Sequence, residues 1–252
     1  MTGLTRSMFR PSDDAVTFPY NIPGNAMACS ELTHLHSLLD DLKQYAGSVS
    51  SSTTTGITGT TGITIDTLIA STETIKSSIC GALKDLEEAV STTTTTSTTT
   101  SNNQVLPYEM DGYGNRYYID DANIPSLLSL PVLGYMSREN PIYRSTREYI
   151  LSTKNPYYFD GIDAAGIGGP HVGYNYTWPM AIVTAAMTSD DDIEILRCLE
   201  ILKNSAARTG FMHESFNVND VNDYTRSWFA WANGLFGELL LQLIDTKPHL
   251  LI

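Results

Sequence analysis

Apolar residues recur at every third or fourth position along most of this 252-residue chain, and no convincing run alternates apolar and polar residues as a half-buried strand does. Helical spacing occurs in seven segments, at about 24–46, 65–90, 122–136, 140–153, 179–188, 190–208 and 225–246. The pattern predicts an all-α fold of antiparallel helical hairpins, in which the loops at the helix ends carry the functional side chains.

Three of these segments indicate which face of the helix should be buried. In the first, the apolar stripe consists of Leu32, Leu35, Leu38, Leu39 and Leu42. In 190–208, which begins with an acidic run suited to a helix N-terminus, the expected buried face consists of Ile193, Leu196, Leu199 and Leu202. The last segment has a wide apolar face that predicts deep burial, made of Phe229, Ala232, Leu235, Phe236, Leu239, Leu240 and Leu243, with Trp231 also expected in the core.

Two stretches rich in Ser and Thr interrupt the helical pattern, at about 48–64 and 91–104. Because such sequences bury little apolar area, both are predicted to be disordered insertions. Residues 105–119 contain the turn dipeptide Asp111–Gly112 and are expected to form a short hairpin or an irregular loop. The Gly- and Tyr-rich stretch 154–178 is expected to be a loop.

Composition argues against several classes of function. The net charge is −13, and a strongly acidic chain is a poor partner for nucleic acid, whose phosphates require Lys and Arg. A neutral ligand such as a sugar is compatible with it. No apolar run reaches the length of a membrane span, and no signal peptide is visible, so the compartment stays open.

The chain has three cysteines, Cys29, Cys80 and Cys198, and none forms a CxxC pair, which argues against a zinc cluster. Their odd number gives no disulfide framework. Cys198 lies in an amphipathic helical pattern and is expected to be a small core residue.

The densest cluster of chemically useful residues lies near the C-terminus. Glu214 stands among Phe211, Met212 and Phe216, and carboxylates in apolar surroundings concentrate at catalytic sites. Arg226 and two tryptophans follow. Carboxylates, an arginine fork and flat aromatic rings are the groups that a sugar-cleaving pocket needs.

This cluster also resembles the C-terminal signature of glycoside hydrolase family 125, whose members are exo-acting α-1,6-mannosidases. Four further segments resemble that family in the same order: Phe9-Arg10-Pro11-Ser12-Asp13-Asp14, Asp120-Asp121-Ala122-Asn123-Ile124-Pro125-Ser126-Leu127-Leu128, Gly166-Ile167-Gly168-Gly169-Pro170-His171 and Trp178-Pro179-Met180. The resemblance implies that residues 1–252 form a single domain, the C-terminal part of an (α/α)6 barrel, with the family's N-terminal part lacking.

The activity that the resemblance implies is inverting hydrolysis, with Asp13 or Asp14 as the general acid and Glu214 as the general base. Mannose would be released from the non-reducing end of an α-1,6-linked, mannose-containing oligosaccharide or glycan, without cofactor or catalytic metal. The substrate-binding side chains that the motifs imply are Arg10, Asp120, Asp121, Asn123, His171, Trp178, His213 and Arg226.

Several of these residues also have a plainer interpretation. Asp13 and Asp14 suit an exposed turn, Asp121 suits a helix cap, and Glu214 could simply pair with Arg226. A single histidine is more often structural than a ligand, and no second histidine stands at the spacing of a zinc HExxH motif. For the whole chain, the alternatives are a catalytically inactive remnant of the family and a carbohydrate-binding protein without turnover.

Overall fold

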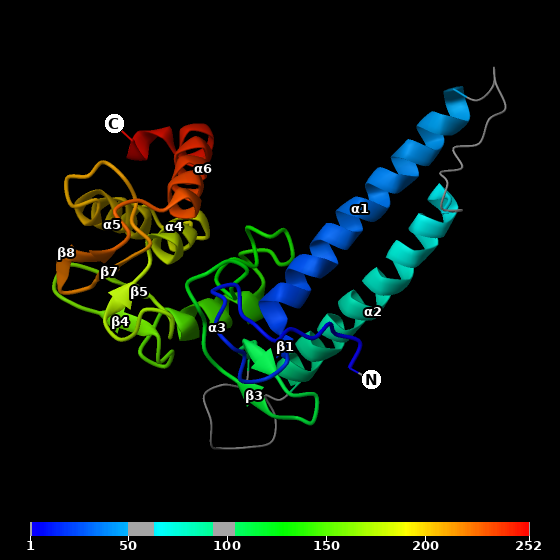
Figure 1. Cartoon of the computed structure of the whole chain (residues 1–252), viewed down its shortest axis with the longest axis horizontal. Coiled ribbons are helices and arrows are strands. Elements are labelled where there is room, and N and C mark those ends of the chain that lie inside the picture. The colour runs from blue at the N-terminus through cyan, green and yellow to red at the C-terminus, as the bar shows by residue number, and fades with distance from the viewer. Residues whose placement is uncertain (1, 50–62, 93–103, 252) are drawn as a thin grey trace.

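The computed structural model of the chain describes residues 2–49, 63–92 and 104–251 (Figure 1). The greater part of the two predicted Ser/Thr-rich insertions lies outside the described residues. Their first residues, which were assigned to the insertions, are helical instead: Ser48 and Ser91 each belong to the last turns of a helix.

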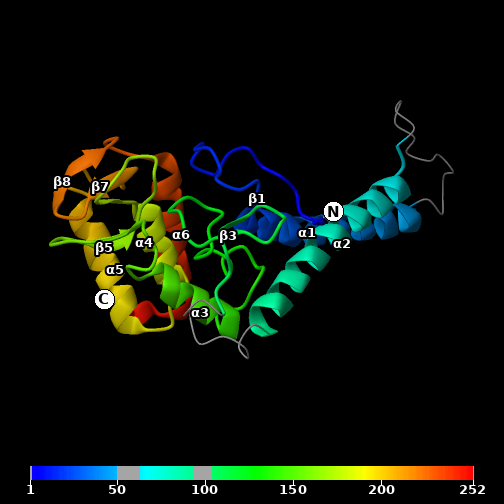
Figure 2. The ribbon, with the colours of Figure 1, turned by 90° about the horizontal axis from the view of Figure 1, so that it is seen from below.

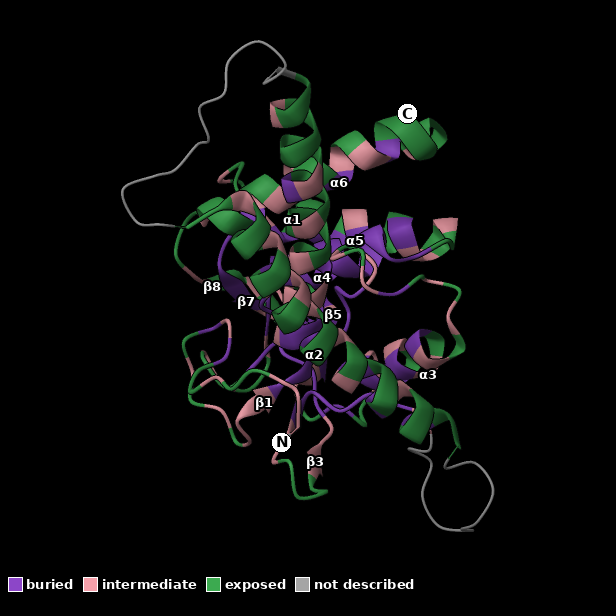
Figure 3. Ribbon diagram, turned by 90° about the vertical axis from the view of Figure 1, so that its right-hand side faces the viewer, coloured by how far each residue is buried: buried purple, intermediate pink, exposed green. Residues whose placement is uncertain are grey.

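Two long helices form a hairpin that extends away from the rest of the molecule (Figures 1 and 2). Helix α1 (Ile22–Val49) packs antiparallel to helix α2 (Ile65–Thr92), which confirms the two helices predicted there. The predicted stripe on α1 is largely uncovered, because Leu35, Leu38 and Leu42 are exposed. Figure 3 shows how much of this hairpin faces solvent.

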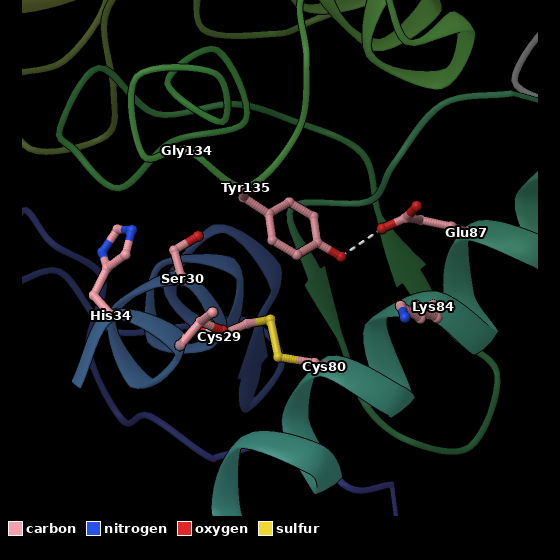
Figure 4. A pocket seen from close by; sticks show the side chains of 9 residues that line it. Cys29, Ser30, His34, Cys80, Lys84, Glu87, Gly134 and Tyr135 are labelled. Atoms are coloured by element: carbon pink, nitrogen blue, oxygen red, sulfur yellow. Dashed lines mark hydrogen bonds between the residues drawn. A yellow bond between two sulfur atoms is a disulfide. The ribbon is translucent and has the colours of Figure 1, made fainter. Parts of the chain in front are cut away.

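A disulfide bond joins the two helices of this hairpin, between Cys29 and Cys80, which the odd number of cysteines did not lead us to expect (Figure 4). Sequence spacing could not pair them, because the partners are 51 residues apart and meet only through helix packing. Beside the bond lies a cavity of about 310 Å³ that also contacts the 134–135 turn. Cys198 is free and buried, as expected for a small core residue.

The body of the molecule contains the remaining helices: α3 (Pro141–Ile150), α4 (Pro179–Met187), α5 (Asp192–Ser205), α6 (Ala230–Thr246) and the short 3-10 helix η2 (Pro248–Leu250). Helix α4 is the centre of the core: all nine of its residues are buried, and it packs against α5 and α6. The chain is largely helical, which confirms the predicted class. Within the described ranges no helix is both long and apolar enough to cross a bilayer.

In the part of the chain that the structure describes, three small antiparallel sheets join the segments between the helices. The first consists of β1 (Tyr20–Asn21), β2 (Glu109–Met110) and β3 (Arg116–Tyr117). The second consists of β4 (Tyr158–Asp160) and β5 (Ala165–Ile167), and the third of β6 (Tyr176–Thr177), β7 (Ser215–Asn217) and β8 (Asp220–Thr225). The hairpin expected in 105–119 is confirmed as β2–β3. The stretch 154–178, expected to be a loop, contains β4, β5 and β6.

The predicted helix at 122–136 is wrong: this segment is a series of turns. Its prolines and Gly134 interrupt the helical hydrogen-bond ladder, and the carboxylate of Asp120 accepts the amides of Leu127 and Leu128. The leucines were real core residues, since Leu127, Leu128 and Leu130 are buried, but burial alone does not distinguish a helix from a packed turn.

Two further helices differ from their predicted form. Helix α5 begins at Asp192, capped by Asp191, and buries Ile195, Cys198, Ile201 and Leu202, whereas Ile193 and Leu196 of the predicted face are 77% and 46% exposed. Helix α6 begins at Ala230 and not at 225, because residues 220–225 pair with β7 as strand β8. Of its predicted face only Ala232, Leu239 and Leu243 are fully buried, and Trp231, expected in the core, is 42% exposed.

The disulfide should stabilise the fold through the chain that it closes. A cross-link between residues 51 apart lowers the entropy of the unfolded chain by an amount worth about 4 kcal/mol. We expect the Cys29→Ser/Cys80→Ser double variant to melt at a clearly lower temperature than the oxidised wild type in thermal denaturation followed by circular dichroism. A dithiol reductant should lower the melting temperature of the wild type and leave that of the variant unchanged; equal melting temperatures would contradict the expectation.

Candidate active site

The first motif forms a tight turn that is closed by its own backbone. The amide of Arg10 donates to the carbonyl of Asp14 at 2.8 Å, and the amide of Asp13 donates to the carbonyl of Arg10 at 3.0 Å. Asp13 adopts a φ of +65°, in the left-handed region that few residues other than glycine adopt readily. The turn leaves Asp13 exposed and Asp14 half-buried.

Arg10 holds this turn against the first sheet and is buried. Its Nε donates to Oε1 of Glu109 at 2.7 Å, and the two side chains are 3% and 0% exposed. Oε2 of Glu109 accepts the amides of Thr17 and Phe18 at 2.8 and 3.0 Å. Its hydrogen bonds brace the turn, and the substrate contact that the sequence predicts for Arg10 stays a prediction.

Both oxygens of the Asp14 carboxylate have a partner. The hydroxyl of Ser12 donates to Oδ2 at 2.7 Å, and Nδ1 of His171 lies 3.3 Å from Oδ1. His171 comes from the motif that follows β5, so the turn and this distant loop meet at Asp14.

The second motif is buried behind that turn. Asp120 is fully buried and accepts the amides of Leu127 and Leu128 at 2.8 and 3.0 Å. Burial raises the pKa of the Asp120 carboxyl group to about 8, against the effect of these amides. Asp121 accepts both the amide and the side-chain nitrogen of Asn123 at 3.0 Å, and burial raises its pKa. It therefore caps a local turn, close to the plainer interpretation of this residue.

Glycine is required where the third motif crosses the third sheet. A Cβ atom on Gly168 would lie 2.0 Å from the carbonyl oxygen of Tyr176 and 2.7 Å from the ring of Phe159. On Gly169 it would lie 3.0 Å from Oδ2 of Asp121. A side chain does not fit at Gly168, and one at Gly169 would require Asp121 to shift, so the two glycines allow the loop that brings His171 to the Asp13–Asp14 turn.

Trp178 links His171 to the C-terminal cluster. Its ring is 2% exposed and makes edge contacts with the rings of His171 and Phe229, whose centroids lie 6.0 and 6.2 Å away. A platform for a sugar ring needs an open face, so a buried Trp178 fits a supporting role. Trp228, which precedes Phe229, is 58% exposed.

Glu214 lies directly before β7, and its side chain is 9% exposed. Nε of Arg226 lies 3.1 Å from Glu214 Oε1, and the same guanidinium covers the ring of Phe229 at 5.5 Å. The plainer interpretation of Glu214, an ion pair with Arg226, is therefore part of the structure. The pair is open to solvent on one side, because the Arg226 side chain is 62% exposed.

His213 holds the same arginine from behind. It is fully buried, its ring stacks on Tyr224 with centroids 3.7 Å apart, and its Nδ1 lies 3.1 Å from the carbonyl oxygen of Arg226. A carbonyl only accepts, so Nδ1 carries the proton. These contacts support Arg226, and Nε2 of His213 has no hydrogen-bond partner among the described residues, so the contact with substrate that the sequence predicts stays a prediction.

A continuous series of side-chain contacts thus joins the first motif to the last: Asp14, His171, Trp178, Phe229, Arg226 and Glu214. Sequence reasoning missed Glu109, Ser12 and Phe229. Ser12 and Phe229 stood within the motifs, whereas nothing in the sequence around Glu109 indicated that it neutralises Arg10.

Helical hairpins whose loops present carboxylates, an arginine and aromatic rings together define a class of glycosidase scaffold, the (α/α)6 fold. The chain belongs to glycoside hydrolase family 125: the family model described as "Metal-independent alpha-mannosidase (GH125)" matches residues 1–241.

Two relatives are informative. A solved metal-independent α-mannosidase from Streptococcus pneumoniae, in a non-productive complex with α-1,6-mannobiose, superposes with a TM-score of 0.81 and 35% identity over 98% of this chain and 52% of its own. The Meiotically up-regulated gene 157 protein of Schizosaccharomyces pombe is 43% identical over 249 residues, 98% of this chain and 43% of that protein. The chain spans about half the length of each.

The two arginine–carboxylate pairs should respond differently to mutation. Glu109→Ala leaves the buried guanidinium of Arg10 without its counter-charge, which we expect to cost about 3–5 kcal/mol of unfolding free energy. Glu214→Ala breaks a pair whose arginine is exposed, so we expect a loss below about 1 kcal/mol. Urea unfolding of both variants measures the difference, and similar losses would refute the assignment of Arg10 and Glu109 as the brace.

Proposed function

We propose that this chain carries the catalytic loops of an inverting exo-α-1,6-mannosidase, with a carboxyl group of the Asp13–Asp14 turn as general acid and Glu214 as general base. The observation that carries the proposal is the continuous contact series from Asp14 to Glu214. It connects two carboxyl groups, the pair that glycoside hydrolysis requires, through aromatic rings and an arginine from distant segments of the chain.

The surroundings of Glu214 suit a general base. Arg226 holds Oε1, and none of the described residues donates to Oε2, which is thus open to a water molecule. The ion pair with Arg226 restrains the carboxylate at this oxygen. In the proposed reaction Glu214 removes a proton from this water as its oxygen attacks the anomeric carbon.

The Asp13–Asp14 turn stands at the other end of the series and is partly open to solvent. Its carboxyl group would protonate the glycosidic oxygen while the water attacks from the opposite face. An inverting mechanism needs about 6.5–9.5 Å between the two carboxyl groups, to leave room for the water. Exposed Trp228 is the proposed platform for the apolar face of a pyranose ring.

The proposed substrate is an α-1,6-linked mannoside. Support comes from family membership and from the structural relative, whose complex contains α-1,6-mannobiose. The exo mode and the absence of a metal step rest on the family resemblance, whose description as metal-independent agrees with an acid–base mechanism.

A second candidate is a chain that retains the site but does not turn over. Exposed apolar residues on several helices favour it: Leu35, Leu38, Leu42, Ile193, Leu196, Leu241 and Ile244. Contiguous exposed apolar surface marks an interaction site. If further helices must cover these faces before the pocket closes to water, this chain alone would bind mannosides weakly or not at all.

The test is turnover of α-1,6-mannobiose, with the anomer of the released mannose followed by NMR. We expect inversion, and loss of activity by at least a hundredfold in Glu214→Gln, because an amide cannot accept the proton of water. Substrate binding by calorimetry should survive the substitution, since the side chain keeps its shape.

Glu238→Gln, a change of the same chemistry on the exposed face of α6, is the matched control and should keep full activity. Equal rates on α-1,2- and α-1,3-mannobiose would contradict the linkage. A folded wild-type chain that binds mannobiose without cleaving it would favour the second candidate.

A further inference from the structure

We propose that Asn175 carries an N-linked glycan, and that the chain therefore folds in an oxidising compartment of the secretory pathway. The acceptor motif is Asn175-Tyr176-Thr177, in which a hydroxyl-bearing residue stands two positions after an asparagine, and it occurs once in the sequence. The inference goes beyond the proposed function, because it concerns one end of the third sheet and holds whether or not the chain cleaves mannosides.

The acceptor side chain is open to solvent. Asn175 is exposed, and none of the described residues forms a hydrogen bond with its carboxamide. Its backbone is held in place, because its carbonyl accepts the amide of Val218 at 2.8 Å. Its φ of +66° lies in the left-handed region, which asparagine adopts more readily than most residues. An exposed side chain on a fixed backbone can carry a bulky sugar without displacing a packed group.

The sheet register places this asparagine away from the proposed general base. Strand β6 pairs antiparallel with β7, so Asn175, directly before β6, lies beside Val218, directly after β7. Glu214 stands directly before β7, at the other end of the strand. The two positions on β7 are separated by about 13 Å of extended chain. A glycan on Asn175 therefore starts at the β7–β8 turn and not beside Glu214.

The hydroxyl of the motif becomes inaccessible when the sheet forms. Thr177 is fully buried, and its Oγ1 donates to the carbonyl of Ile167 at 3.0 Å. Because the motif requires this hydroxyl as well as the asparagine, the glycan must be attached before β6 packs against β5. The same hydrogen bond gives Thr177 a role in the fold, so the motif by itself does not establish that the asparagine is modified.

The disulfide bond between Cys29 and Cys80 independently indicates the compartment (Figure 4). Such bonds form and persist in oxidising compartments, including the lumen of the endoplasmic reticulum, and are rare in the cytosol, where thiols are kept reduced. The third cysteine, Cys198, is buried and free. The cross-link and the exposed acceptor motif therefore point to the same compartment, although they lie in different parts of the molecule.

The transfer is a substitution at an anomeric carbon. The carboxamide nitrogen of Asn175 forms a bond to the anomeric carbon of the first sugar of a lipid-pyrophosphate-linked oligosaccharide. The bond between that carbon and the pyrophosphate oxygen breaks, and the lipid pyrophosphate leaves with its electron pair. The nitrogen loses one proton to a base of the transferase, so the step needs neither an oxidant nor a reductant.

The first test uses the protein isolated from the cells that produce it. Peptide N-glycosidase removes an N-linked glycan and converts its asparagine into aspartate. In heavy-oxygen water, we expect mass spectrometry to find labelled aspartate at position 175, and the digested protein should migrate faster in a denaturing gel. An unmodified Asn175 in the undigested protein would overturn the proposal.

Two asparagine variants form a matched pair. Asn175→Gln and Asn222→Gln each replace an exposed asparagine near the β7–β8 turn, but the residue two positions after Asn222 is Tyr224, which cannot complete the motif. In the same cells, Asn175→Gln should lose the gel shift completely and Asn222→Gln should keep it. A shift that survives in Asn175→Gln would overturn the assignment to this asparagine.

Variants of the hydroxyl-bearing residue separate recognition from fold. Thr177→Val keeps the shape of the side chain and removes the hydroxyl, so it should lose the gel shift, whereas Thr177→Ser should retain it. Because the shift is read on denatured protein, a variant that folds poorly still gives an answer. A full shift in Thr177→Val would contradict modification through this motif.

The compartment is tested on the thiols of the same isolated protein. Alkylation of the denatured, unreduced chain should label Cys198 and leave Cys29 and Cys80 unlabelled. Labelling of all three cysteines would overturn the inference of an oxidising compartment.

The order of events is tested with unmodified chain made in bacteria. Offered to the isolated transferase and its lipid-linked donor, the folded chain should stay unmodified, whereas the reduced and unfolded chain should be modified at Asn175. Equal modification of both would contradict attachment before β6 packs.

Discussion

The buried ion pair of Arg10 with Glu109 fixes the part of the molecule on which the candidate site depends. Two charges removed from water are tolerated only when their geometry and remaining hydrogen bonds are good. Here Glu109 also accepts the amides of Thr17 and Phe18, so one carboxylate satisfies a guanidinium and two backbone donors. The turn that carries Asp14 is thereby attached to β2, which lies far along the chain. The position of the turn is therefore set by this contact as well as by its own short segment.

A second constraint carries the other half of the site to this turn. Gly168 lets β5 and β6 approach so closely that no side chain fits between them, and β6 pairs with β7, which begins directly after Glu214. The same approach therefore places His171 against Asp14 and brings the C-terminal cluster alongside Trp178. The contacts of the Trp178 and Phe229 rings connect the surroundings of Asp14 to those of Glu214. Helix α4, whose residues are all buried, supports these contacts from the core.

The sequence predicted the helices of strong periodicity, since each of them buries one face whatever its neighbours are. It failed where the outcome depends on tertiary contact. Asp120 turns 122–136 into capped turns, β7 converts the start of the last predicted helix into a strand, and Cys29 meets Cys80 only because two long helices pack together. On α5 the buried face is the one that packs against α4. Both faces of this helix are apolar, so the sequence cannot tell which of them is buried unless the packing partner is known. The motifs indicated a candidate site, but they could not separate residues that could touch a ligand from residues that hold the candidate site together.

Burial separates those two roles. Arg10 and Asp120 have little or no exposed surface, and their hydrogen bonds are directed at the protein itself. His213 is equally buried and is held through Nδ1, whereas none of the described residues is a hydrogen-bond partner of its Nε2. Asp14 and Arg226 keep a side open to solvent, and Glu214 is held at one oxygen only. The neighbours His213 and Glu214 illustrate the division: one binds the carbonyl of Arg226 and the other its guanidinium, so a single arginine is fixed at both ends. A buried charged or polar residue is stabilised by partners within the fold, whereas a group that exchanges protons with a substrate must be reachable from solvent. For this reason a single motif can contain both kinds of residue, as the buried His213 and the exposed Arg226 do in the C-terminal cluster.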